Sequence, residues 1–108
     1  MKIWGRKCAL TGCSVVRLLV ASHAKKWSLS TNEERLDAFN GLLLSASADK
    51  LFDVGLISFA SNGKLLVSPS VTPADLATQG LRMGMKLSRI ETRHLPYFEA
   101  HRKAHGFT

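Results

Sequence analysis

The chain has 108 residues, of which 45% are apolar, and carries a formal net charge of +7 at pH 7. This length fits a single domain with one modest hydrophobic core, and the composition excludes a disordered chain. No apolar run approaches the roughly 18–20 residues that span a bilayer, and the N-terminus lacks the apolar core of a secretory signal. We therefore expect a cytoplasmic protein with no membrane partner.

The first part of the chain predicts a strand followed by a loop. Residues 15–21 (VVRLLVA) are apolar and partly β-branched, which favours a strand that ends at residues 22–23. The polar residues 28–35 (SLSTNEER) predict a loop. We expect Glu33 and Glu34 to be solvated charges of that loop.

The middle of the chain predicts a short helix and a β-hairpin. Residues 45–55 (SASADKLFDVG) form the helix, which Gly55 ends. Residues 56–68 (LISFASNGKLLVS) contain two alternating apolar runs around Asn62 and Gly63, which indicate a hairpin. An Asn-Gly pair accepts positive φ at both central turn positions, so we expect both residues to adopt it.

Two helices are predicted near the C-terminus, which makes the whole a small α+β domain. Residues 72–80 (TPADLATQG) begin with Thr72 as the N-cap and Pro73 at the first helical position. Residues 94–107 predict a final helix. Three histidines are expected on the surface of this final helix: His94, His101 and His105.

The charge is unevenly distributed along the chain. Residues 1–26 contain six Lys and Arg side chains and no acidic one, whereas residues 27–81 contain six of the eight acidic side chains. Residues 82–103 add six basic side chains and two acidic ones. This distribution suits a protein that binds a polyanion, with the polyanion wrapped around a site that needs carboxylates. The alternative interpretation is a basic protein with no specialised partner.

Both cysteines and both tryptophans are expected to pack inside the domain. A zinc site at Cys8 and Cys13 would need two further ligands, and the sequence has no second cysteine pair. A disulfide is not expected in a cytosolic chain. We interpret the cysteines as small buried residues around a turn at residues 11–12, with a metal role as the alternative. Trp4 and Trp27 are interpreted as packing residues.

One histidine, one asparagine and two carboxylates stand at informative spacings. Asn40 follows His23 by 17 residues, and Asp49 follows Asn40 by nine. Asp53 lies four residues after Asp49, so the two carboxylates share one face of the predicted helix. Two neighbouring carboxylates repel each other unless a divalent cation lies beside them. These four residues are therefore the candidate functional site.

The segments that contain these residues resemble the HNH endonuclease family. "ASHAKKW" and "NGLLLSASADKLFDVGLISF" are similar to segments of its restriction-type branch, and the likeness runs from about residue 7 to residue 69. The resemblance implies one HNH-like domain over residues 1–108, built around a ββα-metal finger in which two strands and a helix hold one divalent ion. The β-hairpin and a helical part over residues 72–108 would be additions to that finger.

The resemblance also implies roles for single residues. His23 matches the histidine that deprotonates the attacking water, and Asn40 matches the residue that holds the histidine loop by hydrogen bonds. Asp49 matches the metal ligand on the helix, and Asp53 matches a second helix position that is a ligand in some branches. Carboxylate ligands favour Mg²⁺ or Mn²⁺ over Zn²⁺.

The implied partner is double-stranded DNA, and the implied source is a bacterium or a phage. Cutting both strands of a duplex usually needs two sites, so a homodimer is a further expectation. Four basic residues are expected to hold DNA phosphates without reading the base sequence: Lys7, Arg17, Lys25 and Lys26.

Two departures from the family pattern leave other hypotheses open. Many members carry Asp or His where this chain has Ser22, and some carry histidine where it has Ala48. The alternative function is therefore that of a catalytically inactive HNH-fold DNA-binding module. A protein-interaction domain is a third hypothesis, which predicts an exposed apolar patch.

Overall fold

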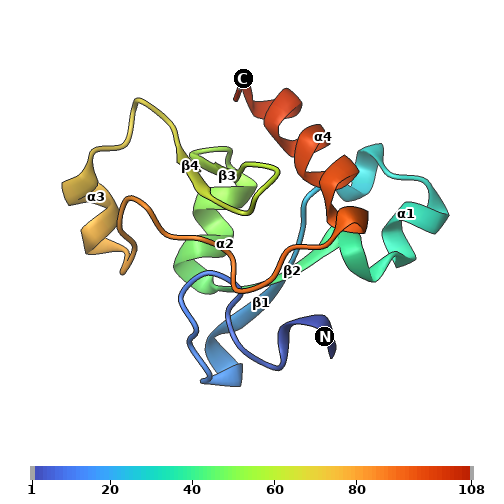
Figure 1. Ribbon diagram of the computed structural model, residues 1–108, viewed down its shortest axis with the longest axis horizontal. Coiled ribbons are helices and arrows are strands. Elements are labelled where there is room, and N and C mark those ends of the chain that lie inside the picture. The colour runs from blue at the N-terminus through green and yellow to red at the C-terminus, as the bar shows by residue number, and fades with distance from the viewer. Residues whose placement is uncertain (1, 108) are drawn as a thin grey trace.

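The computed structural model describes residues 2–107 and confirms a small α+β fold. Figure 1 shows the helix α2 at the centre, with α3 to one side and α1 to the other. The helices of the described part are α1 (Asn32–Leu36), α2 (Ala46–Asp53), α3 (Pro73–Thr78) and α4 (Leu95–His105). The strands are β1 (Leu19–His23), β2 (Gly41–Ser45), β3 (Ile57–Phe59) and β4 (Leu65–Val67).

The strands β1 and β2 form an antiparallel pair on which α2 packs. In this register His23 lies opposite Gly41, and Ser22 lies opposite Leu42. Leu42 and Leu44 are fully buried, because alternate residues of β2 face the core. Together β1, β2 and α2 make the ββα arrangement that the sequence predicts.

The predicted strand begins later than expected but ends at His23 as predicted. Residues Val16–Leu18 form a 3₁₀ turn, in which the Leu18 amide donates to the Val15 carbonyl at 2.9 Å. The strand therefore starts at Leu19, and His23 is its last residue. His23 is thus held by strand pairing rather than by a loop.

The prediction of a loop over residues 28–35 is wrong, because α1 lies there. Thr31 and Glu34 form a capping box, in which the Thr31 hydroxyl accepts from the Glu34 amide at 3.1 Å. The Glu34 carboxylate in turn accepts from the Thr31 amide at 2.9 Å. This reciprocal pair satisfies two of the amides that a helix start leaves free. Glu34 is consequently a capping residue and not a solvated loop charge.

The helix α2 ends before Gly55 as predicted. Two features require glycine at this position, namely its backbone conformation and its contact with α4. Gly55 has φ +78°, which favours glycine. A Cβ at this position would lie 2.1 Å from Nδ1 of His105 on α4. The end of α2 and the end of α4 therefore approach each other through Gly55.

The predicted hairpin is present as β3 and β4, but its turn differs in one detail. Only Gly63, with φ +84°, has positive φ, whereas both Asn62 and Gly63 were expected to adopt it. The Ala60 carbonyl accepts from the Gly63 amide at 2.9 Å, and the Asn62 side chain accepts from the Lys64 amide at 3.0 Å. This geometry is that of a three-residue hairpin loop with glycine in the left-handed position.

The C-terminal helices are present as predicted, but two of their histidines are not on the surface. Thr72 caps α3 in a capping box with Asp75. His94 and His101 are 0% and 3% exposed, so the expectation of surface histidines is wrong for both. The ring of His101 stacks on Phe52 at 3.8 Å between centroids.

Hydrogen bonds explain why His101 is tolerated in the core. Its Nε2 lies 2.7 Å from the Phe52 carbonyl, which only accepts, so Nε2 donates. Its Nδ1 lies 2.7 Å from the Ser58 hydroxyl and accepts from it. Burial lowers the pKa of His101 to about 4, so the ring is neutral at pH 7. Most of the core is apolar, and its largest fully buried apolar members are Phe52, Phe59, Phe98, Leu42, Leu44, Ile57 and Leu76.

Candidate active site

A groove of about 570 Å³ lies between β1 and α2. It brings together three of the four candidate site residues, namely His23, Asp49 and Asp53. Strand β1 and the turn after it supply one wall, and α2 supplies both carboxylates. The complete lining is Val20, Ala21, Ser22, His23, Lys26, Trp27, Ser28, Asp49 and Asp53.

His23 is half-buried at the end of β1, and its ring contacts Trp27. The two ring centroids lie 5.4 Å apart with the planes at 80°, which is an edge-to-face contact. Trp27 begins a 3₁₀ turn (Trp27–Leu29) and is 55% exposed, so its interpretation as a packing residue is wrong. Trp4, in contrast, is buried as predicted and donates from its indole to the Gly41 carbonyl at 3.1 Å.

The two carboxylates lie one helical turn apart on α2 and face the same groove. Asp49 is half-buried, and one of its oxygens accepts a hydrogen bond from the Ser22 hydroxyl. Asp53 is exposed at the C-terminal end of the helix. Ser22 therefore links the strand to the helix at the groove, a role that its sequence position did not indicate.

Asn40 is fully buried beside the groove and does not line it. Its side-chain oxygen accepts from the Lys25 amide at 2.8 Å, and its side-chain nitrogen donates to the Glu34 carbonyl at 3.1 Å. Its own carbonyl accepts from the Ala24 amide at 2.9 Å. Asn40 thus ties the chain that follows His23 to the start of β2.

The four basic residues expected to bind DNA occupy different surroundings. The ammonium of Lys25 contacts both carboxylate oxygens of Glu34, at 2.8 and 2.9 Å. The hydrogen bond from Lys25 holds the pKa of the Glu34 carboxyl below its usual value. Lys26 is exposed and lines the groove. Arg17 and Lys7 are exposed outside the groove lining.

Residues 8–60 match the family model described as HNH endonuclease. The chain belongs to the HNH endonuclease family. The matched segment contains β1, β2 and α2 and therefore the whole groove, and it is consistent with the ββα-metal fold. A search of curated proteins gives no match. Among residues 2–107, no helix is long and apolar enough to cross a membrane.

Two side chains of the HNH groove, Asp49 and Asp53, could hold a hard divalent cation. Asp49 and Asp53 provide two carboxylates, and Mg²⁺ is commonly bound by one or two carboxylates together with waters and phosphate oxygens. Within the described chain, no group of three or more His, Cys, Asp and Glu side chains could hold a metal ion. A structural zinc site would need four such ligands.

Ala48 and Cys8, two other residues singled out in the HNH segment, are buried away from the groove. Ala48 is 0% exposed, so its side chain lies in the core and does not line the groove. Cys8 is buried as predicted, and its sulfur accepts from the amides of Thr11 and Ser45 at 3.3 and 3.2 Å. Cys13 is half-buried and is a free thiol like Cys8.

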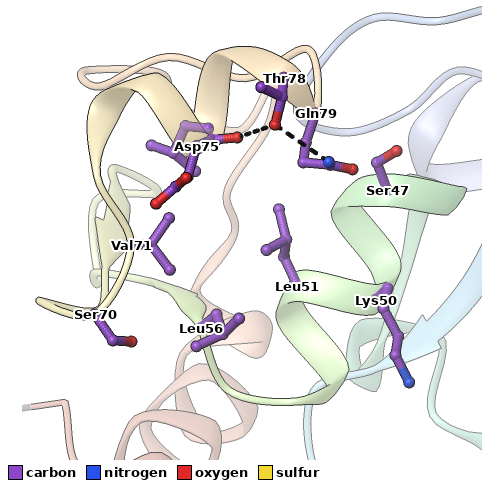
Figure 2. A pocket seen from close by; sticks show the side chains of 10 residues that line it. Ser47, Lys50, Leu51, Leu56, Ser70, Val71, Asp75, Thr78 and Gln79 are labelled. Carbon is purple, nitrogen blue, oxygen red and sulfur yellow. Dashed lines mark hydrogen bonds between the residues drawn. The ribbon is translucent and has the colours of Figure 1, made fainter.

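A second pocket, of about 470 Å³, lies between α2 and α3 (Figure 2). It is formed by a different face of α2, which presents Leu51 to it, whereas Asp49 and Asp53 face the groove. Its polar groups bind one another, as the Thr78 hydroxyl donates to the Asp75 carbonyl at 2.6 Å. The lining of this pocket contains no histidine, and its one carboxylate, that of Asp75, accepts from the Thr72 amide at 3.0 Å.

Proposed function

We propose that this protein is a metal-dependent DNA endonuclease that hydrolyses phosphodiester bonds, with His23 as the general base and one divalent cation. One observation carries the proposal. His23, Asp49 and Asp53 line one groove, which lies inside the segment that matches the HNH endonuclease family. A base and two carboxylates in one groove are the groups that such hydrolysis needs.

His23 accepts the proton of the attacking water. Imidazole is suited to this step because it takes up and releases protons near neutral pH. The edge of the His23 ring packs against Trp27, which restricts rotation of the ring within the groove. The pairing of His23 with Gly41 in the sheet fixes its backbone.

Asn40 acts as a positioning residue rather than by touching the substrate. Its bonds to Lys25 and Glu34 hold the turn after His23 in one conformation. Ser22 has a similar role for Asp49, because the hydrogen bond between them fixes the orientation of that carboxylate.

Asp49 and Asp53 would hold the cation, which we expect to be Mg²⁺ or Mn²⁺. When bound, the cation stabilises the negative charge that develops on the phosphate and on the leaving oxygen. The cation also offsets the negative charge of the two carboxylates. Without the cation, the carboxylates would repel the phosphates of the DNA.

Double-stranded DNA is the proposed substrate, held by basic side chains around the groove. Lys26 lines the groove itself, whereas Lys25 is paired with Glu34, and Arg17 and Lys7 are exposed outside the groove lining. Phosphate contacts of this kind set the register of DNA but not its sequence. We further propose restriction-type biology in a bacterium or phage and a homodimer for cutting both strands.

A second candidate function is that of a DNA-binding module without catalysis. It is favoured by the absence, among residues 2–107, of a cluster of three or more metal-ligating His, Cys, Asp and Glu side chains. Ser22 also stands where many family members carry Asp or His, and a serine hydroxyl binds a metal ion more weakly than either.

Incubation with supercoiled plasmid distinguishes the two candidates. We expect nicked plasmid with Mg²⁺ or Mn²⁺ and none with EDTA. A gel shift of the plasmid without cutting under any divalent ion would favour the binding module. If the plasmid is neither shifted nor cut, both candidate functions are overturned.

A further inference from the structure

The two tryptophans have opposite environments. Packing in the core explains the presence of Trp4 but not that of Trp27. Trp4 is 5% exposed, whereas Trp27 is 55% exposed at the rim of the groove. A large aromatic side chain left in water contributes little to folding. The position of Trp27 beside His23 therefore points to a role in binding.

The indole of Trp27 is held in place although it is exposed. The Trp27 carbonyl accepts from Nε of Arg35 at 2.9 Å, and the guanidinium of Arg35 lies 4.9 Å from the ring centroid. The turn before it is fixed by the Ser30 hydroxyl, which donates to the Lys26 carbonyl at 2.8 Å. A preorganised aromatic ring loses little conformational entropy on binding a ligand.

The positive charges around the Trp27 ring favour a nucleic-acid base as its ligand rather than an apolar protein surface. Lys26 precedes Trp27 on the exposed side of the groove, and Arg35 lies over the indole. Cationic side chains beside an exposed aromatic ring are the features with which proteins bind single-stranded nucleic acid. They track the phosphates while the ring stacks on a base.

We propose that Trp27 is a stacking subsite for an unpaired DNA base next to the phosphate that His23 faces. This inference rests on the proposed function and deepens it, because it narrows the double-stranded substrate to DNA in which a nucleotide beside the cut phosphate is unpaired. Bases of an intact duplex stack on each other and do not offer a face to the indole. The protein should therefore prefer DNA with an unpaired nucleotide, such as a single strand, over a fully paired duplex.

Binding of fluorescently labelled oligonucleotides tests the proposal without relying on cleavage. A single strand and its fully paired duplex are titrated with the protein in EDTA, which prevents metal-dependent cutting and leaves the His23–Trp27 contact intact, by fluorescence anisotropy. Trp27→Ala is then titrated in the same way. Trp27→Phe tests whether any aromatic ring suffices, and Leu29→Ala is the matched control, since Leu29 is 64% exposed in the same turn but does not line the groove.

We expect Trp27→Ala to weaken binding of the single strand by about 5- to 150-fold, the range that corresponds to one aromatic–base stack. Binding of the duplex should change less than about twofold, and Leu29→Ala should change neither. Trp27→Phe should retain most of the affinity for the single strand. The single strand should quench the tryptophan fluorescence of the protein with Trp27 intact. It should not quench the fluorescence of Trp27→Phe, in which the remaining tryptophan, Trp4, shows that the protein is folded.

The outcomes separate this inference from the proposed function. If the protein binds both DNAs but Trp27→Ala weakens neither, or weakens both equally, the stacking subsite is overturned and the endonuclease proposal stands. If the protein with Trp27 intact binds neither DNA, the proposed function falls and the subsite falls with it.

Discussion

The hydroxyl of Ser22 in β1 donates a hydrogen bond to Oδ1 of Asp49 in α2, 27 positions along the chain. This bond connects the strand that carries His23 with the helix that carries both carboxylates. It occupies one oxygen of Asp49, so we expect the other oxygen, Oδ2, to bind the cation. In the proposed metal site, Ser22 would therefore orient the ligand Asp49 and would not itself bind the cation.

Substitutions of these two residues should therefore differ in their effect on cation affinity. Asp49→Asn should abolish measurable Mn²⁺ binding, because it removes a charged ligand. Ser22→Ala should lower the affinity about 10-fold, as the loss of a partner that orients a metal ligand usually does. Isothermal titration calorimetry measures both. Glu99→Gln on the exposed side of α4 is the control, and wild-type affinity in Asp49→Asn would contradict the assignment.

Replacement of Asn40 should destabilise the fold as well as the groove. Asn40→Ala removes the partners of the Lys25 amide and the Glu34 carbonyl, which should cost about 2–3 kcal/mol of unfolding free energy. Urea denaturation measures this loss. Asn62→Ala in the exposed hairpin turn should cost less than about 1 kcal/mol, because water replaces its hydrogen bond. Equal losses in the two variants would argue against a buried role for Asn40.

Stability should fall between pH 7 and pH 5 because of His101. Burial lowers its pKa to about 4 from the ordinary value of 6.5, so in this window the unfolded chain binds a proton that the folded chain excludes. The free energy of unfolding should drop by about 2 kcal/mol from pH 7 to pH 5. Burial also lowers the pKa of His94, which adds to the drop in the same direction.

Urea denaturation at pH 7, 6 and 5 checks this window, which lies above the titration of the carboxyl groups. His101→Gln should remove most of the pH dependence, and the remainder should come from His94. A drop that is identical in wild type and His101→Gln would show that another group is responsible.

Much of the fold was predictable because its signals are local. Thr72 and Pro73 mark the start of α3, and the Asn62-Gly63 pair marks the hairpin, within a few residues of the structure that they form. The same kind of signal is present at α1, where Thr31 and Glu34 have the spacing of a capping box, so this helix is predictable from the sequence as well.

Other features depend on contacts between distant segments, which no local pattern contains. The bond between Ser22 and Asp49 requires the register of β1 against α2. His101 follows Phe98 by three residues on one face of α4, which could have indicated burial, but its partners Ser58 and Phe52 come from elsewhere. The exposure of Trp27 likewise follows from the turn geometry and not from its hydrophobicity.

Lys26, in the turn after β1, should contribute to DNA affinity. Lys50, on the face of α2 that lines the second pocket, should not. Lys26→Ala should weaken duplex binding and lower the slope of log K against log salt concentration by about 0.9, the value for one phosphate contact. Lys50→Ala is the matched control, since Lys50 is equally exposed but lines the second pocket. Anisotropy titrations at several salt concentrations measure both slopes. Equal slopes for the two variants would exclude Lys26 as a phosphate contact.

The central claim is that His23 is the general base of a nuclease, and single-turnover cleavage of plasmid DNA with Mn²⁺ tests it most directly. His23→Ala should cut about 10²- to 10⁴-fold more slowly than wild type, and added imidazole should restore part of the rate. His105→Ala, outside the groove, should cut normally. Undiminished cutting by His23→Ala would contradict the account.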